Sequence, residues 1–98
     1  MKFTTMAGHE ISLEWNKDTL REHASRGDWL ASKARVRCDP TMPPSQIDET
    51  LIHELTHAAS DFGGLDLSEW QVNVLALLLQ NALAPFLSLP KPSKPEEG

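Results

Sequence analysis

The chain has 98 residues, 40% of them hydrophobic and 23% charged, which is ordinary for a single globular domain with one modest core. Its formal net charge of −5 and the lack of a long basic run argue against a nucleic-acid partner. Cys38 is the only cysteine, which excludes an intrachain disulfide, and no apolar run resembles a signal peptide or the ~20 residues of a membrane span. We therefore expect a cytoplasmic protein without a membrane partner.

Two short extended segments are predicted near the N-terminus, over residues 2–5 and 10–15, with Ala7-Gly8 in the turn of a hairpin. The second segment alternates polar residues with the apolar Ile11, Leu13 and Trp15, as a half-buried strand does. The polar residues 16–26 predict a short helix or turn.

A strand with an apolar inner face and a basic outer face is predicted over residues 29–39. Its apolar and charged positions alternate, with Ala34, Val36 and Cys38 set between Lys33, Arg35, Arg37 and Asp39. The prolines that follow cannot continue a ladder and end the strand. Cys38 falls on the inner face, where we expect it to pack as a small apolar residue rather than to bind a metal.

The motif His53-Glu54-Leu55-Thr56-His57 lies on the next predicted element, a helix from a capping box at Ser45 to the turn Gly63-Gly64. Positions four apart share one helix face, so His53 and His57 can bind one metal ion together. Glu54 lies about 100° further round the helix, from where it can reach a metal-bound water as a general base. Both histidines fall outside the apolar arc of the helix, which argues against a packing role. The pattern is the His-Glu-x-x-His arrangement of zinc peptidases.

The last predicted helix, over residues 67–84, is apolar around most of its circumference and has one main polar gap. Glu69 lies in that gap, and a carboxylate on so apolar a helix is costly to bury without a partner. Zinc peptidases need a third protein ligand, and the glycine turn can fold this helix back on the first. We expect Glu69 to be that ligand, and Asn73, one turn later, to orient Glu69 or a histidine.

Other assignments stay open at this point. Glu69 would also suit the first turn of a helix as a carboxylate that complements the helix dipole or faces solvent. Asp61 and Asp66 compete for the role of third ligand. A site made of histidines alone would need His9 or His23.

The tract TLIHELTHAASDFGGLDLSEWQVNVLALLLQ resembles the gluzincin branch of the zincin metallopeptidases, and in particular the minimal single-domain zincins found in bacteriophages and prophages. The similarity extends over about residues 26–84. It implies an α+β fold in which a small twisted sheet of about three strands packs on the active-site helix, with a second helix towards the C-terminus. It also implies a location in the cytoplasm of a bacterial or phage-infected host cell.

The same resemblance implies that zinc is held by His53, His57 and Glu69, with Glu54 as general base. It suggests peptide substrates that lie along a sheet edge, which we expect at residues 33–39. Larger zincins add a Tyr or His that stabilises the oxyanion. This chain has no Tyr, and its candidates for that role are His9, His23, Arg35 and Arg37.

The predicted function is therefore hydrolysis of peptide bonds by a zinc-bound water that Glu54 activates. The alternative is a catalytically weak or inactive, zinc-stabilised module for protein interaction. The apolar helix over residues 67–84 favours a homodimer, unless the N-terminal segment or the tail covers it within one chain. We expect one domain over residues 1–85 and a disordered, proline-rich tail over residues 86–98.

Overall fold

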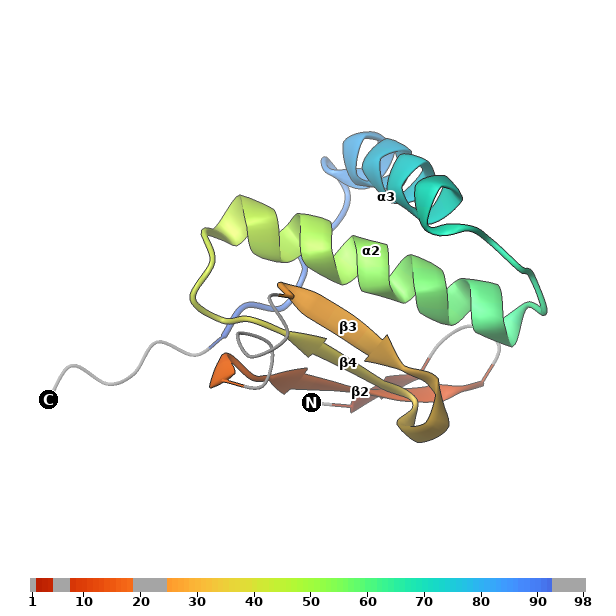
Figure 1. Cartoon of the computed structure of the whole chain (residues 1–98). Helices are drawn as coiled ribbons and strands as arrows, with labels where there is room; N and C mark the ends of the chain where they lie inside the picture. Colours follow the sequence, from red (N-terminus) through yellow and green to blue (C-terminus); the bar gives the residue numbers. More distant parts are fainter. Residues whose placement is uncertain (1, 5–7, 19–24, 93–98) are drawn as a thin grey trace, which may run out of the picture.

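The structure is a computed structural model that describes residues 2–4, 8–18 and 25–92. Within these residues the fold has three layers: a mixed sheet, the helix α2 on one face of it, and the helix α3 on the far side of α2 (Figure 1). The elements in chain order are β1 (Lys2–Thr4), β2 (Glu10–Trp15), β3 (Gly27–Leu30), a 3₁₀ turn (Ala31–Lys33), β4 (Arg35–Cys38), α2 (Pro44–Phe62) and α3 (Glu69–Leu83). The predicted α+β class is confirmed.

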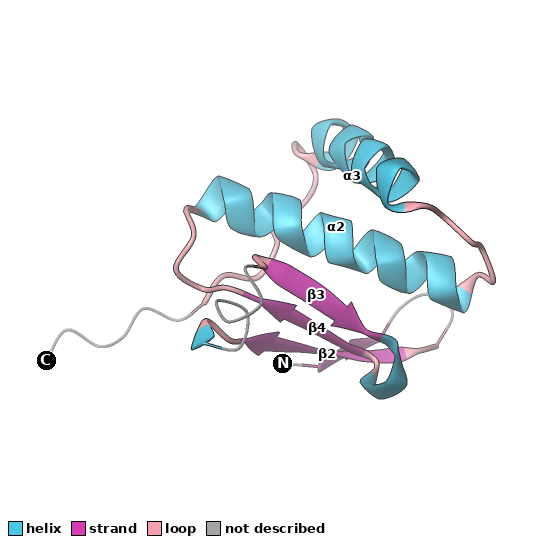
Figure 2. Cartoon of the chain, viewed as in Figure 1, coloured by secondary structure: helices cyan, strands magenta, loops and turns pink. Residues whose placement is uncertain are grey.

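In the described part of the chain, four strands form the sheet, one more than predicted, in the order β1-β2-β4-β3 (Figure 2). The central strands β2 and β4 are parallel, and each has an antiparallel neighbour on its outer side. The predicted N-terminal hairpin is confirmed by β1 and β2, in which Phe3 pairs with Ile11. Of its predicted turn at Ala7-Gly8, Gly8 has a left-handed φ of 80°, and Ala7 lies outside the described residues. Most of the short helix or turn predicted over residues 16–26 lies outside them as well.

The single strand predicted over residues 29–39 is wrong, because this segment is a hairpin. β3 and β4 run antiparallel with Trp29 opposite Val36, and the 3₁₀ turn between them ends at Ala34, whose φ of 47° is left-handed. Left-handed alanine is uncommon, and no glycine or asparagine marks the reversal in the sequence. β4 therefore lies inside the sheet, so the predicted substrate edge at residues 33–39 is also wrong. The edge strand beside α2 is β3.

The hydrophobic core lies between the sheet and α2. Side chains from β2, β4 and α2 make it up: Ile11, Leu13, Val36, Cys38, Ile47, Leu51 and Ala58. Cys38 is fully buried among them, as predicted, and burial first, then the charges of Asp39 and Glu54, raise the pKa of its thiol to about 12. The thiol is therefore neutral and acts as a packing group.

The start of α2 differs from the prediction, whereas its end agrees. Pro43 is the N-cap, Pro44 is the first helical residue and no side chain caps the helix, so the predicted capping box at Ser45 is wrong. Proline suits this position because the first helical amides have no acceptor within the helix. At the other end the Gly63 amide donates to the Ala59 carbonyl at 2.9 Å, and Gly64 takes the left-handed conformation (φ 69°).

Part of the proline-rich tail contacts the domain. Leu89 is half-buried against the core, and the Lys91 ammonium pairs with the Asp48 carboxylate on α2. Residues 93–98 lie outside the described residues, so their disorder stays a prediction. No helix in the described ranges has both the length and the apolar composition that crossing a membrane requires.

Candidate metal centre

His53 and His57 project from α2 one turn apart, as their spacing predicts. Their ring centroids lie 5.0 Å apart with the ring planes inclined by 67°, and their side chains are 21% and 26% exposed. They therefore lie at the rim of the domain, between the buried face of α2 and solvent. Neither histidine belongs to the hydrophobic core, as their position outside the apolar arc of the helix predicts.

Glu69 is the first residue of α3, and a capping box fixes the start of that helix directly before it. The Gln71 amide donates to Ser68 Oγ at 3.1 Å, and the Ser68 amide donates to Gln71 Oε1 at 2.8 Å. The box satisfies two helix donors that would otherwise lack partners. Ser68 is therefore the N-cap of α3, and the helix begins at Glu69.

Ser60 holds the loop that turns the chain from α2 back towards its own histidines. This buried residue donates through Oγ to the Leu65 carbonyl at 2.9 Å and accepts from the Leu67 amide at 3.4 Å. The Leu65 amide also donates to the Ser60 carbonyl at 2.8 Å. These bonds, together with the left-handed Gly64, bring the start of α3 beside His53 and His57.

The three predicted ligands converge. His53 Nε2 lies 2.7 Å from Glu69 Oε1, and His57 Nε2 lies 3.1 Å from Glu69 Oε2. One ligand atom from each residue falls within 4.8 Å of the other two. In the part of the chain that the structure describes, no other group of three His, Cys, Asp or Glu residues is close enough to hold an ion. Two imidazoles and one carboxylate can bind a metal, and they match the donor set of one class of catalytic zinc sites.

The two carboxylates of this centre differ in environment. The Glu69 side chain is 66% exposed. Its partial burial acts to raise its pKa, but the contacts with His53 and His57 outweigh this and lower the pKa below the usual value. Glu54 is only 8% exposed, and burial first, then the charges of Glu69 and Asp28, raise its pKa from 4.5 to about 7. Glu54 is thus the carboxylate that holds a proton near neutral pH in the metal-free protein.

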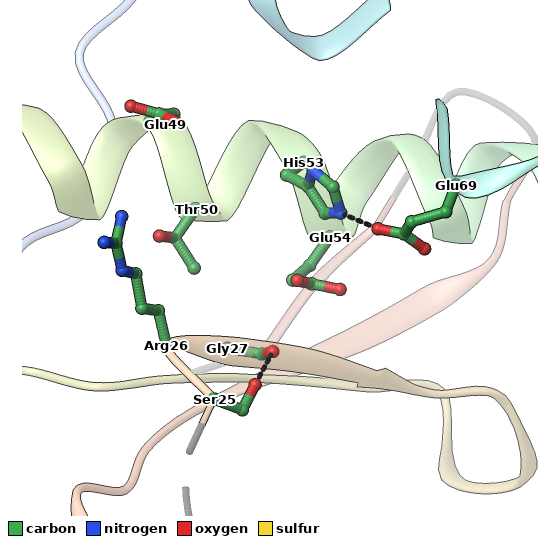
Figure 3. A pocket seen from close by; sticks show the side chains of 8 residues that line it. All are labelled: Ser25, Arg26, Gly27, Glu49, Thr50, His53, Glu54 and Glu69. Carbon is green, nitrogen blue, oxygen red and sulfur yellow. Dashed lines mark hydrogen bonds and ion pairs between the residues drawn. The ribbon is translucent and has the colours of Figure 1, made fainter. Parts of the chain in front are cut away.

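A cavity of about 320 Å³ joins Glu54 to His53 and Glu69, between the start of β3 and α2 (Figure 3). Its lining residues are Ser25, Arg26, Gly27, Glu49, Thr50, His53, Glu54 and Glu69. At Gly27 an added Cβ would lie 2.5 Å from Thr50 Cγ2 and 2.9 Å from the Arg37 carbonyl oxygen, so only glycine allows β3 to approach α2 so closely. Glu54 lies in this cavity but outside the group of ligand atoms.

Sequence reasoning missed the β3 side of this cavity. Gly27 lies between two predicted elements, and nothing in the local sequence relates it to Thr50 or Glu54, more than twenty residues later. The hint that was available is the Gly-Asp pair that opens β3. A glycine at the start of a strand often marks a close approach of backbones.

The competing candidates for the third ligand lie elsewhere. Asp61 accepts a hydrogen bond from Trp29 Nε1 at 2.6 Å, and Asp66 is exposed and outside the ligand group. His9 stacks on Phe62 with ring centroids 4.0 Å apart, and His23 lies outside the described residues. Asn73 is exposed, and among the described residues no hydrogen bond joins it to Glu69 or to either histidine, so its orienting role stays a prediction.

The arginines suggested for the oxyanion are engaged with acids on the sheet. Arg37 forms a bidentate pair with Asp28, with Nε 2.8 Å from Oδ1, and this hydrogen bond raises the pKa of its guanidinium. Arg35 lies 3.5 Å from Glu14. Neither residue lines the cavity, whereas Arg26, which the sequence did not single out, does.

Comparison of the chain with protein-family models, curated proteins and solved structures gives no match. The resemblance to gluzincins therefore rests on the residues of the chain alone, and function has to be argued from the centre itself.

Proposed function

We propose that this protein is a zinc-dependent metallopeptidase of the gluzincin type, with His53, His57 and Glu69 as zinc ligands. One observation carries the proposal. Three side chains that could hold a metal come from two helices, with one ligand atom of each within 4.8 Å of the others, while Glu54 shares a cavity with His53 and Glu69 without joining the group. Catalytic zinc sites have the same division, with three protein ligands, a position left for water and a separate general base.

In this proposal the zinc and Glu54 have separate chemical roles. When bound, zinc supplies a Lewis acid that polarises the scissile carbonyl and makes water more acidic. Glu54 takes the proton from the attacking water and returns it to the leaving amine. Burial of Glu54 beside Gly27 restricts its carboxylate to the cavity, so it meets water there rather than in bulk solvent.

The free edge of β3 is the proposed place for the peptide substrate. β3 pairs with β4 on one side, and among the described strands none pairs with its other side. Residues Ser25 to Gly27, where β3 begins, line the same cavity as His53 and Glu69. An extended peptide that adds to this edge through main-chain hydrogen bonds would pass beside the metal centre.

The test combines metal content with cleavage. Elemental analysis of the purified protein should give one zinc per chain, and a peptide library should be cut by the zinc-loaded protein. Glu54→Gln should keep the zinc and lose cleavage, because Glu54 acts on water and not on the ion. A zinc-loaded wild type that cuts no peptide would refute the peptidase, and loss of zinc in Glu54→Gln would refute the division of roles.

A second candidate function, association with another protein, is favoured by the outer surface of α3. The exposed apolar side chains there, called the α3 apolar surface below, are Trp70, Val74, Leu75, Leu77, Leu78, Leu79 and Leu83. The proposed occupant is a second copy of this chain, related by a two-fold axis that would pair the surface with itself and close the assembly.

The chain itself does not supply a cover for this surface in its described part. Trp15 in the N-terminal segment and Leu89 in the tail pack against the core instead, and Phe86 in the tail is 81% exposed. Residues 93–98 contain no large apolar side chain. Monomeric proteins rarely expose large contiguous apolar patches, so a second copy is the simplest way to bury this one.

A further inference from the structure

Arg26 is the cation among the residues that line the cavity, and none of the ion pairs between described residues neutralises its charge. Its side chain is exposed and lines the same space as His53, Glu54 and Glu69. The other arginines in the described part of the chain, Arg35 and Arg37, are paired with acids, whereas no ion pair engages Arg26. An Arg fork that has no protein partner can bind a carboxylate in a bidentate manner.

The backbone around Arg26 is held in place. The Arg26 carbonyl accepts from the Asp39 amide at 2.9 Å, and Ser25 Oγ donates to the Gly27 carbonyl at 2.7 Å. Gly27 then packs directly against Thr50 on α2. The base of the Arg26 side chain is thus positioned beside α2 by contacts on both sides.

The direction of the side chain follows from the same contacts. Figure 3 shows the Arg26 guanidinium on the side of the cavity towards Glu49 and Thr50, with Glu69 at the opposite side. Glu49 and Thr50 precede His53 and Glu54 by one helical turn, about 5.4 Å along the axis. A group bound by Arg26 would therefore lie about one peptide residue or two away from a carbonyl at the metal ligands, given ~3.3–3.6 Å per extended residue.

We propose that Arg26 binds a carboxylate of the substrate and so makes the site selective for peptides with an acidic group next to the scissile bond. The carboxylate can be an Asp or Glu side chain or the free C-terminus of a short peptide, since the chemistry is the same. Arg26 is a specificity-determining residue in this proposal and takes no part in proton transfer. The inference relies on the proposed peptidase function for the identity of the substrate, but carboxylate binding can be measured without cleavage.

The experiment measures binding of fluorescent peptides by anisotropy to the Glu54→Gln variant, with and without zinc. Four matched peptides separate the two carboxylate sources: Glu or Gln at one position next to the central bond, each with either a free or an amidated C-terminus. The protein with Arg26 should bind a carboxylate peptide about tenfold more tightly than its neutral match, the size of one charge-assisted hydrogen-bonded contact. A difference between the Glu and Gln peptides identifies a side-chain carboxylate, and a difference between the free and amidated peptides identifies the C-terminal carboxylate.

Variants at Arg26 and Glu49 test whether the preference for carboxylate peptides depends on Arg26. Arg26→Gln should remove the tenfold difference, and Arg26→Lys should keep part of it, because a lysine retains the charge without the fork. Glu49→Gln is the matched control at the same end of the cavity. It should leave the preference intact or increase it, because it removes a negative charge near Arg26.

The outcomes are distinct. Equal binding of acidic and neutral peptides, or a preference that survives Arg26→Gln, would overturn the proposal, and the second result would indicate that the metal itself takes the carboxylate. If an Arg26-dependent preference is found but the zinc-loaded wild type cuts no peptide, the carboxylate site stands and the peptidase fails. If neutral and acidic peptides are cut equally well, the peptidase stands and the carboxylate site fails.

Discussion

α3 is the more apolar of the two helices but the less buried, and α2 is the more polar but the more buried. α3 is apolar at most positions, yet its buried residues are Val72 and Ala76, whereas α2 carries more polar residues and buries several of them, including Thr50, Glu54 and Ser60. The reason is the layer that each helix occupies. α2 lies between the sheet and α3, while α3 contacts α2 on one side only (Figure 1). The apolar composition of a helix therefore indicates how much burial would stabilise it. The layer that the helix occupies decides how much of its surface is buried.

The same contrast separates the two carboxylates of the candidate metal centre. Glu54 comes from the covered helix and is buried, and Glu69 comes from the outer helix and is mostly exposed. Their pKa values move in opposite directions for that reason. A buried carboxylate suits proton transfer, and an exposed, ionised one suits metal binding.

The largest expected effect is on zinc affinity, where one residue of α3 should matter as much as a histidine of α2. Glu69→Ala should weaken zinc binding by more than the roughly 10–100-fold that loss of an outer partner costs, and Asn73→Ala should stay within that range. Competition with a chromogenic zinc chelator measures both. Asp66→Ala and Asp61→Ala are the controls and should leave affinity unchanged. If Asp66→Ala weakened zinc binding and Glu69→Ala did not, α3 would not supply a ligand.

The next largest effect is on stability, and it is tested by a Leu→Ala substitution in each helix. Leu51 on α2 is 2% exposed, and Leu51→Ala should lower the free energy of unfolding by about 2–5 kcal/mol because it leaves a cavity in the core. Leu77 on α3 is 55% exposed, and in the monomer Leu77→Ala should change stability by no more than about 0.5 kcal/mol. Denaturant unfolding at low protein concentration tests the pair. Equal losses would mean that α3 is as covered as α2.

The pH dependence of stability should report the burial of Glu54. In the metal-free protein its folded pKa of about 7 lies above the unfolded value of 4.5. Between these values the unfolded chain loses the proton and the folded protein keeps it, so stability should fall as the pH rises, by up to about 3 kcal/mol. Unfolding in the presence of EDTA at pH 4.5 to 8 measures this. In Glu54→Gln this part of the pH dependence should be absent, and an unchanged profile would contradict the burial.

The smallest expected effect is self-association through the α3 apolar surface. At protein concentrations about tenfold above the dissociation constant, the dimer would add about 1.4 kcal/mol of apparent stability. Sedimentation equilibrium at micromolar concentration should give twice the 10.9 kDa of one chain. Leu78→Glu should return the monomer, and Ser32→Glu, in the 3₁₀ turn of the sheet, should not. A wild-type monomer at all concentrations would reject the dimer and leave the surface for a different partner.

The sequence by itself determined the features that depend on local geometry. The i, i+4 spacing places His53 and His57 on one face of α2 in any helix, and the glycine pair at Gly64 marks the turn that ends α2. Alternation of apolar residues likewise predicted β2 and the inner face of β4. These signals act within a few residues, so no knowledge of the rest of the fold is needed.

The tertiary structure alone decided the features that join distant parts of the chain. Local sequence left Glu69, Asp61 and Asp66 as alternatives, and only the path of the loop around Ser60 brings Glu69 to the histidines. Arg26 and Gly27 enter the cavity because β3 lies at the sheet edge beside α2, and that follows from the turn at Ala34, which has no signal in the sequence. Contacts between residues far apart in the chain depend on the packing of whole elements, and a single residue pattern does not contain that information.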